Sequence, residues 1–146
     1  MMKAIVLGGS KGIGKAIADS LSSIGCDVIA TSRKEIDTAN LGSVKRFIQK
    51  QKQTDILVLN TGGPPPKEFS KVTEKEWQKY HNQLFLGFCL LLQKLKVNDD
   101  GYIFVITSAV IKEPNPILVI SSAYRLAFTA VFKLASKQLA ARKISC

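Results

Sequence analysis

The stretch KAIVLGGSKGIG, residues 3–14, places Gly8, Gly12 and Gly14 between an apolar run and the start of a helical pattern. KAIVLG has the character of a buried strand, and apolar residues then recur at helical spacing until Gly25 ends the pattern. A glycine-rich turn in this setting points the amides of a helix N-terminus at an anion. The stretch therefore predicts a phosphate-binding turn; the alternative is a tight strand-to-helix turn without a ligand.

The three glycines have separate mechanical reasons in a turn that binds a dinucleotide. Gly8 allows the chain to turn sharply after the strand, Gly12 allows the backbone to approach a pyrophosphate, and Gly14 allows the helix to pack closely on the sheet. The other residues of the turn that we expect to contact the ligand are Ser10, Lys11 and Ile13.

Strand and helix patterns alternate along the rest of the chain. The patterns predict strands at 3–8, 27–32, 55–60 and 102–108, and helices at 13–24, 41–51, 73–96 and 121–142. A capping box formed by Thr73 and Glu76 is expected to start the third helix. The NDDG sequence at 98–101 predicts a turn, and Ile144 is a candidate start of another strand. Strands separated by helices imply right-handed crossovers and a parallel sheet. We expect one doubly wound α/β domain over residues 1–146.

Composition excludes several classes of protein. The chain has 146 residues, 46% of them hydrophobic, which suits one domain with a real core. Its apolar stretches are too short to span a bilayer, no signal peptide is recognisable, and three scattered cysteines fit a reducing cytoplasm without a metal site. The net charge of +10 permits nucleic-acid contact, but the basic residues are scattered and no recognition motif accompanies them. We interpret most of this charge as solvated helix surface.

The spacing Gly8-x3-Gly12-x-Gly14 resembles the T-G-x3-G-x-G pattern of the short-chain dehydrogenase/reductase family, with Leu7 at the threonine position. Further matches are NTGG at 60–63 for the family's N-N-A-G, and Ser108 after the strand where the family's catalytic serine lies. The last helix, ending in LASKQLA, resembles the family helix that carries Tyr-x3-Lys. The resemblance implies a Rossmann fold whose nicotinamide dinucleotide also contacts Asn60 and Gly62.

The resemblance also implies a cofactor preference. Family members that prefer NADP have basic residues in the glycine turn and after the second strand. This chain has Lys11 in the glycine turn and Ser32-Arg33 after the second strand. No acidic residue ends the second strand to hold an NAD ribose. Asp37 lies at the family's adenine-contacting position. We therefore favour NADP over NAD as the cofactor, the alternative being that Lys11 and Arg33 are ordinary surface charge.

The family's catalytic pattern is only partly kept. Ser108 matches the family serine, but Ser121 stands at the tyrosine position, Arg125 at the lysine position and Leu84 at the asparagine position. A guanidinium stays charged and cannot exchange a proton at neutral pH. Tyr124 is a candidate phenol in a shifted position; the alternative is that it packs between helices.

Two functions from different classes follow. The first is an NADP-dependent oxidoreductase acting on a small carbonyl or alcohol substrate, with candidate catalytic residues Ser108, Ser121, Tyr124 and Arg125. The second is a catalytically inactive module that binds a dinucleotide. By the same resemblance we expect a homo-oligomer formed through the two long helices. The resemblance also implies that this chain lacks the family's last strands and substrate lid. The strand at 102–108 would then be an exposed edge of the sheet.

Overall fold

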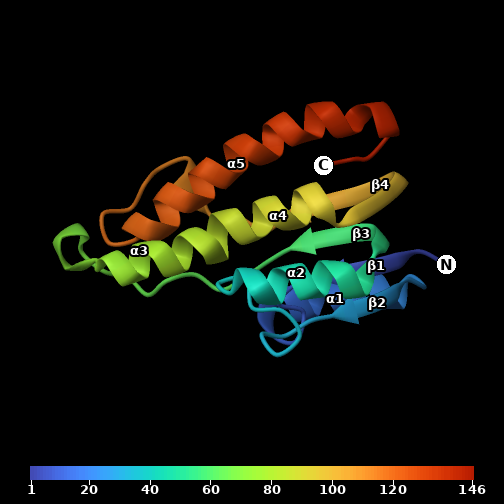
Figure 1. Ribbon diagram of the computed structural model, residues 1–146, viewed down its shortest axis with the longest axis horizontal. Helices are drawn as coiled ribbons and strands as arrows, with labels where there is room; N and C mark the ends of the chain where they lie inside the picture. Colours follow the sequence, from blue (N-terminus) through green and yellow to red (C-terminus); the bar gives the residue numbers. More distant parts are fainter.

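A parallel four-stranded sheet forms the centre of the molecule. The computed structural model describes all 146 residues, and its strands are β1 (Lys3–Val6), β2 (Asp27–Ala30), β3 (Gln53–Leu59) and β4 (Lys96–Val105). Their spatial order is β2-β1-β3-β4, and each neighbouring pair is parallel (Figure 1). The predicted parallel α/β architecture is confirmed.

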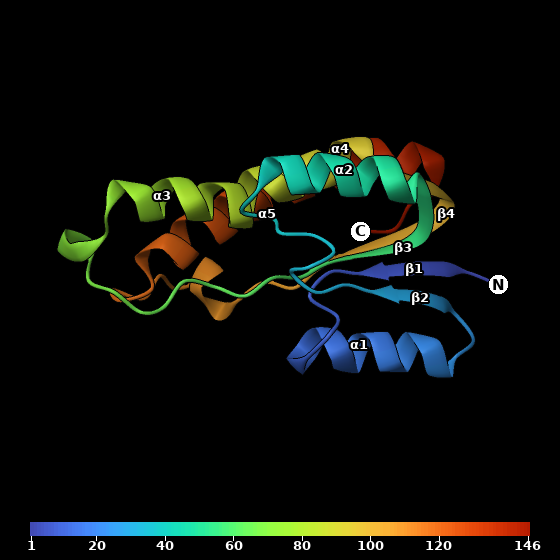
Figure 2. The ribbon, with the colours of Figure 1, turned by 60° about the horizontal axis from the view of Figure 1, so that its bottom comes forward.

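Helices cover both faces of the sheet, as a doubly wound fold requires. The helix α1 (Gly12–Ser23) lies alone on one face, and the remaining helices lie on the other (Figure 2). These are α2 (Leu41–Gln51), α3 (Glu74–His81), α4 (Gly87–Lys94) and α5 (Val119–Leu139). Short 3₁₀ turns at Phe69–Lys71, Ala109–Ile111 and Ala140–Arg142 complete the helical elements. None of the helices is both long and apolar enough to cross a membrane.

The main core lies between the sheet and the larger helical layer. Its fully buried members include Leu57 and Leu59 from β3, Phe88 and Leu91 from α4, and Phe128 from α5. The rings of Phe88 and Phe128 meet edge to face at 5.3 Å. Phe88, Leu91 and Phe128 of the two long helices are therefore core residues within one chain.

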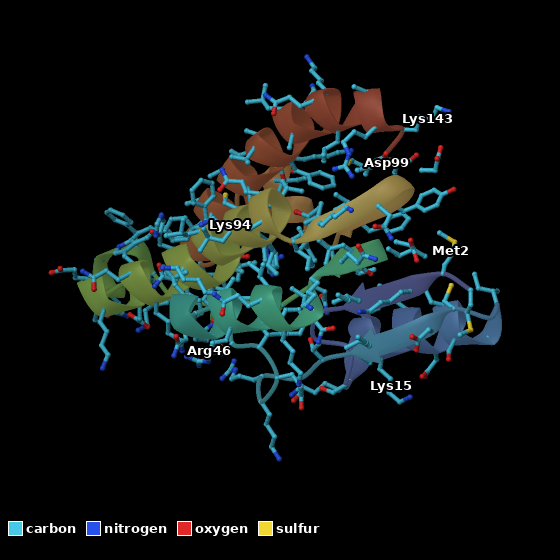
Figure 3. All side chains as sticks on the ribbon, turned by 45° about the vertical axis from the view of Figure 1, so that its right-hand side comes forward. Met2, Lys15, Arg46, Lys94, Asp99 and Lys143 are labelled. Carbon is cyan, nitrogen blue, oxygen red and sulfur yellow. The ribbon has the colours of Figure 1, made fainter.

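Basic side chains lie mainly on the outer helix surfaces. Lys15 on α1, Arg46 on α2 and Lys143 after α5 are exposed and project away from the ribbon (Figure 3). Only four ion pairs form in the chain, among them Lys15 with Asp19 at 2.7 Å. The distribution agrees with the interpretation of the charge as solvated surface.

The predicted helix at 73–96 is interrupted. The capping box at its start is present, because the Thr73 side chain accepts from the Glu76 amide while the Glu76 carboxylate accepts from the Thr73 amide. A π-helical turn, Asn82–Leu86, then separates α3 from α4. Gly87 lies directly after it, where a Cβ atom would come within 2.7 Å of the Thr38 carbonyl oxygen.

The prediction that NDDG at 98–101 forms a turn before the last strand is wrong. The strand β4 begins at Lys96, and residues 98–101 bulge out of it opposite the single residue Asp55 of β3. Asp55 holds the bulge because its carboxylate accepts from the Asn98 side chain at 2.7 Å and from the Lys3 amide at 2.7 Å.

The end of the chain pairs with the β4 edge of the sheet. At β4 the Ile103 amide donates to the Ser145 carbonyl at 2.8 Å, and the Ser145 amide donates to the Gly101 carbonyl at 2.9 Å. Ile144 is buried beside them, so the predicted further strand is present as a single parallel bridge. The single bridge covers the β4 edge only in part, and Tyr102 and Phe104 of β4 point to the opposite face, where they remain 41% and 49% exposed.

Candidate functional site

A cavity of about 810 Å³ opens at the carboxyl ends of β1, β2 and β3. This edge is where doubly wound sheets bind ligands, and the volume is that of an ordinary cofactor pocket. Three segments supply most of its lining, one after each strand. The residues are Leu7, Gly8, Ser10, Lys11, Gly12, Ile13 and Gly14; Ser32, Arg33, Lys34, Ile36, Asp37 and Thr38; and Asn60, Thr61, Gly62 and Gln83.

The glycine turn is shaped for a ligand that approaches its backbone. Gly12 has φ +57°, a left-handed conformation that favours glycine, and a Cβ atom placed on it would meet nothing within 4 Å. Gly14 is the opposite case, because a Cβ atom there would overlap the Gly8 carbonyl oxygen and come within 2.7 Å of the Asn60 side-chain nitrogen. The start of α1 is therefore held tightly against the strand ends, while the turn before it stays open.

Asn60 joins two of the three segments. Its side-chain amide donates to the Leu7 carbonyl at 3.2 Å and so connects the end of β3 to the end of β1. The first turn of α1 contains no acidic side chain, and Lys11 precedes it with extended backbone. Free helix amides and a nearby lysine make this end of the cavity favourable for an anion.

The segment after β2 contains an acidic residue whose position the sequence analysis missed. Glu35 folds back so that its carboxylate accepts from the Ser32 hydroxyl at 2.6 Å and from the Ser32 amide at 2.7 Å. These hydrogen bonds, the hydroxyl's first, hold the pKa of Glu35 below its usual range. The S-x-x-E spacing was a sequence signal for this contact. A carboxylate therefore lies at the end of β2 beside the exposed Arg33.

Asp37 lines the cavity and also organises its own turn. One carboxylate oxygen accepts from the Ala39 amide at 3.0 Å, and the Asp37 amide donates to the Ser43 hydroxyl at 3.1 Å. The segment between β2 and α2 is thus fixed from within, which leaves Asp37 half-buried at the cavity wall.

Ser121 and Arg125 meet on one face of α5, outside the lining of the main cavity. The Arg125 Nε donates to the Ser121 hydroxyl at 3.1 Å, and its Nη1 donates to the Ile106 carbonyl at 3.2 Å. Burial lowers the pKa of Arg125 from its usual value, and no carboxylate pairs with it. A Cβ atom on Gly63 would lie 3.6 Å from Nη2, so the guanidinium adjoins the loop after β3.

Ser108 caps the short 3₁₀ turn after β4. Its hydroxyl accepts weakly from the Val110 amide at 3.5 Å. Ser108 and the Arg125 contact at Ile106 both follow β4, two strands from the glycine turn, which corresponds to about 10 Å across the sheet.

Tyr124 is not placed with these groups. Its hydroxyl donates to the Trp77 carbonyl at 3.2 Å, and its ring meets Trp77 at 5.7 Å and His81 at 5.6 Å. Burial raises the pKa of Tyr124 above its usual value of 10.0. These contacts are those of the alternative, in which Tyr124 packs between helices, because both the ring and the hydroxyl contact α3. A role as a shifted phenol stays a prediction.

Gln83 is one of the lining residues that the sequence analysis did not single out. It lies in the π-helical turn, is 4% exposed, and contacts the loop after β3. A polar side chain within the apolar run around Leu84 was the available signal. No three His, Cys, Asp or Glu side chains come close enough together to bind a metal ion.

Comparisons with known proteins agree with this geometry. The sequence model described as short chain dehydrogenase matches residues 37–146. The uncharacterized oxidoreductase YvrD of Bacillus subtilis is 27% identical over 89% of this chain, which spans 59% of that relative's length.

Two solved structures share the fold. A short chain dehydrogenase from Burkholderia cenocepacia in complex with NADP superposes with a TM-score of 0.90 at 22% identity, covering 98% of this chain and 70% of that one. A 3-ketoacyl-(acyl-carrier-protein) reductase from Brucella melitensis complexed with NADH gives 0.88 at 21% identity, covering 98% and 72%. Because the family's sequence model covers well over half of the residues, the chain belongs to the short chain dehydrogenase family.

Proposed function

We propose that this chain binds NADP(H) in the 810 Å³ cavity and forms the dinucleotide-binding part of an oxidoreductase that acts on a carbonyl or alcohol. The observation that carries the proposal is the convergence of three strand-end segments on one cavity with an open, anion-favouring glycine turn. The Burkholderia neighbour, which has the same fold, is in complex with NADP.

The residues present fit such a cofactor. Open space above Gly12 and the free amides at the start of α1 suit a diphosphate, while Asn60 and Gly62 would line the nicotinamide side. Asp37 would lie toward the adenine. When bound, the cofactor supplies or accepts a hydride; the chain supplies the orientation and a cavity of the right size.

The preference for NADP over NAD rests on side chains and not on the fold, since the two solved neighbours were bound to different cofactors. Lys11, Ser32 and Arg33 line the cavity where a ribose 2′-phosphate would lie, and neither Lys11 nor Arg33 forms an ion pair. Glu35 opposes them. We propose that the two cations outweigh the single carboxylate, which is exposed to solvent and already accepts from the Ser32 hydroxyl and amide.

The reacting end is proposed to contain Ser108, Ser121 and Arg125. Ser108 would orient the substrate oxygen, and Arg125 would donate to ribose or substrate oxygens from its unused N–H groups. The contact between Arg125 and Ser121 also favours a second candidate function, a module that binds the dinucleotide without turnover. In this contact the hydroxyl at the family's tyrosine position already accepts a hydrogen bond from Arg125.

We further propose that the protein assembles as a homo-oligomer through α5, where Leu126 and Leu134 remain 48% and 63% exposed.

Calorimetric titration with NADPH and NADH tests the cofactor. We expect micromolar binding of NADPH and binding of NADH at least tenfold weaker. Arg33→Asp should weaken NADPH binding much more than NADH binding. Arg46→Asp makes the same charge change on the exposed face of α2, outside the cavity lining, and should leave both affinities unchanged. Equal losses for the two cofactors in Arg33→Asp would contradict the proposed preference.

Oxidation of NADPH with a panel of aldehydes and ketones then separates the two functions. Turnover with any member supports the oxidoreductase, whereas tight binding without turnover supports the binding module. Failure to bind either cofactor would reject both.

A further inference from the structure

Gln83 is a buried amide in an otherwise apolar part of the helical layer. It is 4% exposed, and its neighbour Leu84 is 1% exposed. Adjacent residues of a surface helix usually diverge by about 100°, so one of them tends toward solvent. Here both are buried, and they lie in the π-helical turn Asn82–Leu86, a feature often found at functional sites. Leu84 packs with Tyr80 and Ile120, while Gln83 faces the loop after β3.

Two hydrogen bonds fix the orientation of this amide. The Gln83 Nε2 donates to the Gly62 carbonyl at 2.8 Å and to the Thr61 hydroxyl at 3.2 Å. The Gly62 carbonyl can only accept, so the nitrogen and not the oxygen must face it. Both N–H groups of the side chain are therefore used on the loop that forms one wall of the cavity.

The amide oxygen of Gln83, unlike its nitrogen, has no hydrogen-bond partner in the protein. Gln83 Oε1 accepts no hydrogen bond from the protein, and no fully buried side-chain oxygen or nitrogen in the chain lacks a partner. It follows that Oε1 keeps its small exposed area, and Gln83 lines the 810 Å³ cavity. A nearly buried acceptor without a partner is costly unless a ligand or water supplies a donor.

We propose that Gln83 is a binding residue of the dinucleotide site, whose Oε1 accepts a hydrogen bond from a hydroxyl of the nicotinamide-side ribose. This rests on the proposed binding of NADP(H). The position favours that hydroxyl, because Gln83 adjoins Thr61 and Gly62 after β3, whereas Ser32 and Arg33, proposed for the 2′-phosphate, follow β2 at the far side of β1. Leu84, at the family's asparagine position, is apolar and cannot make such a contact.

The same side chain would hold the loop and the ligand together. Its nitrogen fixes Gly62 in place while its oxygen binds the ribose, so that the loop is positioned before the cofactor arrives. This ordering lowers the entropic cost of binding.

The test compares two ligands that differ at the nicotinamide end. NADPH carries both riboses, whereas adenosine 2′,5′-bisphosphate carries only the adenosine half with its 2′-phosphate. Gln83→Met has nearly the same length without either polar atom and should weaken NADPH binding about tenfold, the range for a lost hydrogen bond in a buried site. The affinity for adenosine 2′,5′-bisphosphate should stay within about twofold of wild type, since that ligand does not reach Gln83.

Controls separate a contact from a general loss of structure. Gln93→Met makes the same change at an exposed position of α4 and should alter neither affinity. Gln83→Asn keeps a buried amide but is too short to reach both Gly62 and the ligand. It should give a smaller loss confined to NADPH, and it serves as the test if Gln83→Met does not fold.

The two affinities of the Gln83 variants test whether Gln83 binds the ribose. A selective loss of NADPH affinity supports it. Unchanged NADPH affinity, or equal losses for both ligands, would overturn it and leave the cofactor proposal standing, with Gln83 a structural residue. If the wild-type protein bound neither ligand, the dinucleotide proposal itself would fail, and this one with it.

Discussion

Replacing Gly14 by alanine tests the packing that the cavity depends on. A Cβ atom at this position would overlap the Gly8 carbonyl oxygen and lie within 2.7 Å of the Asn60 side-chain nitrogen. Real Cβ atoms do not come that close, so either the glycine turn moves away from α1 or Asn60 gives up its bond to Leu7. Both movements change the wall of the cavity.

The magnitude follows from the rigidity of the neighbours. One clashing atom belongs to backbone between β1 and α1 and cannot rotate away as a long side chain would. Inserting a methyl group into such a tightly packed place costs about 1–3 kcal/mol. For a chain of this size that corresponds to a fall in the midpoint of thermal unfolding of roughly 2–12 °C.

Calorimetry measures both consequences in one preparation. Gly14→Ala should unfold at a lower temperature and bind NADPH at least tenfold more weakly than wild type. The control is Gly42→Ala in the exposed first turn of α2, where the closest atom belongs to the Asn40 side chain at 3.2 Å. It should be neutral or slightly stabilising. A Gly14→Ala protein with wild-type stability and affinity would show that the close contact between turn and helix is not what holds the site.

Three further changes have expected outcomes. Glu35→Gln removes the carboxylate beside Ser32 and should raise NADPH affinity about two- to fivefold at low salt, with a smaller gain at high salt; no gain in calorimetry would mean that Glu35 does not oppose the 2′-phosphate. Asn98 and the Lys3 amide lower the pKa of Asp55 below 3.8, so its stabilising effect is present above that pH and is lost as the pH falls through the lowered value. Asp55→Asn should therefore be less stable than wild type at neutral pH, with the difference shrinking below about pH 4 in thermal melts; a constant difference would contradict this. Thr73→Ala removes the capping box of α3 and should cost about 1 kcal/mol in urea unfolding; an unchanged midpoint would show that the cap contributes nothing.

Much of the fold could be predicted from the sequence because periodicity and turn chemistry are local signals. The helix at 41–51 agrees at both ends, and the Thr73 capping box formed as its spacing indicates. The start of β4 could not be predicted in this way. NDDG has the composition of a turn, but Asp55, distant in sequence, binds Asn98 and holds the segment in the sheet as a bulge.

The site residues also differ in how well the sequence predicts them. The glycine turn, Arg33 and Asn60 could be assigned to one site because each follows a predicted strand, and parallel strands end at one edge. Gln83 and Glu35 left only weak signals, a polar residue within an apolar run and the S-x-x-E spacing. Gln83 lies in a π-helical turn that has no sequence pattern of its own, and the carboxylate of Glu35 reaches Ser32 only in the folded turn after β2.

Reduction of a carbonyl by hydride transfer also requires a proton donor for the carbonyl oxygen. Ser108 and Ser121 are hydroxyls that do not ionise near neutral pH, the guanidinium of Arg125 stays charged, and the Tyr124 hydroxyl is bound to Trp77. The only histidine, His81, packs against Tyr124 and Phe85 and is absent from the cavity lining. None of the side chains proposed for the reacting end therefore exchanges a proton in the neutral range, and we expect the proton to come from water. We expect any carbonyl reduction by this chain to show no inflection in kcat between about pH 6 and pH 9. An inflection within this range that disappears in His81→Asn would place His81 in the reaction and refute this reasoning.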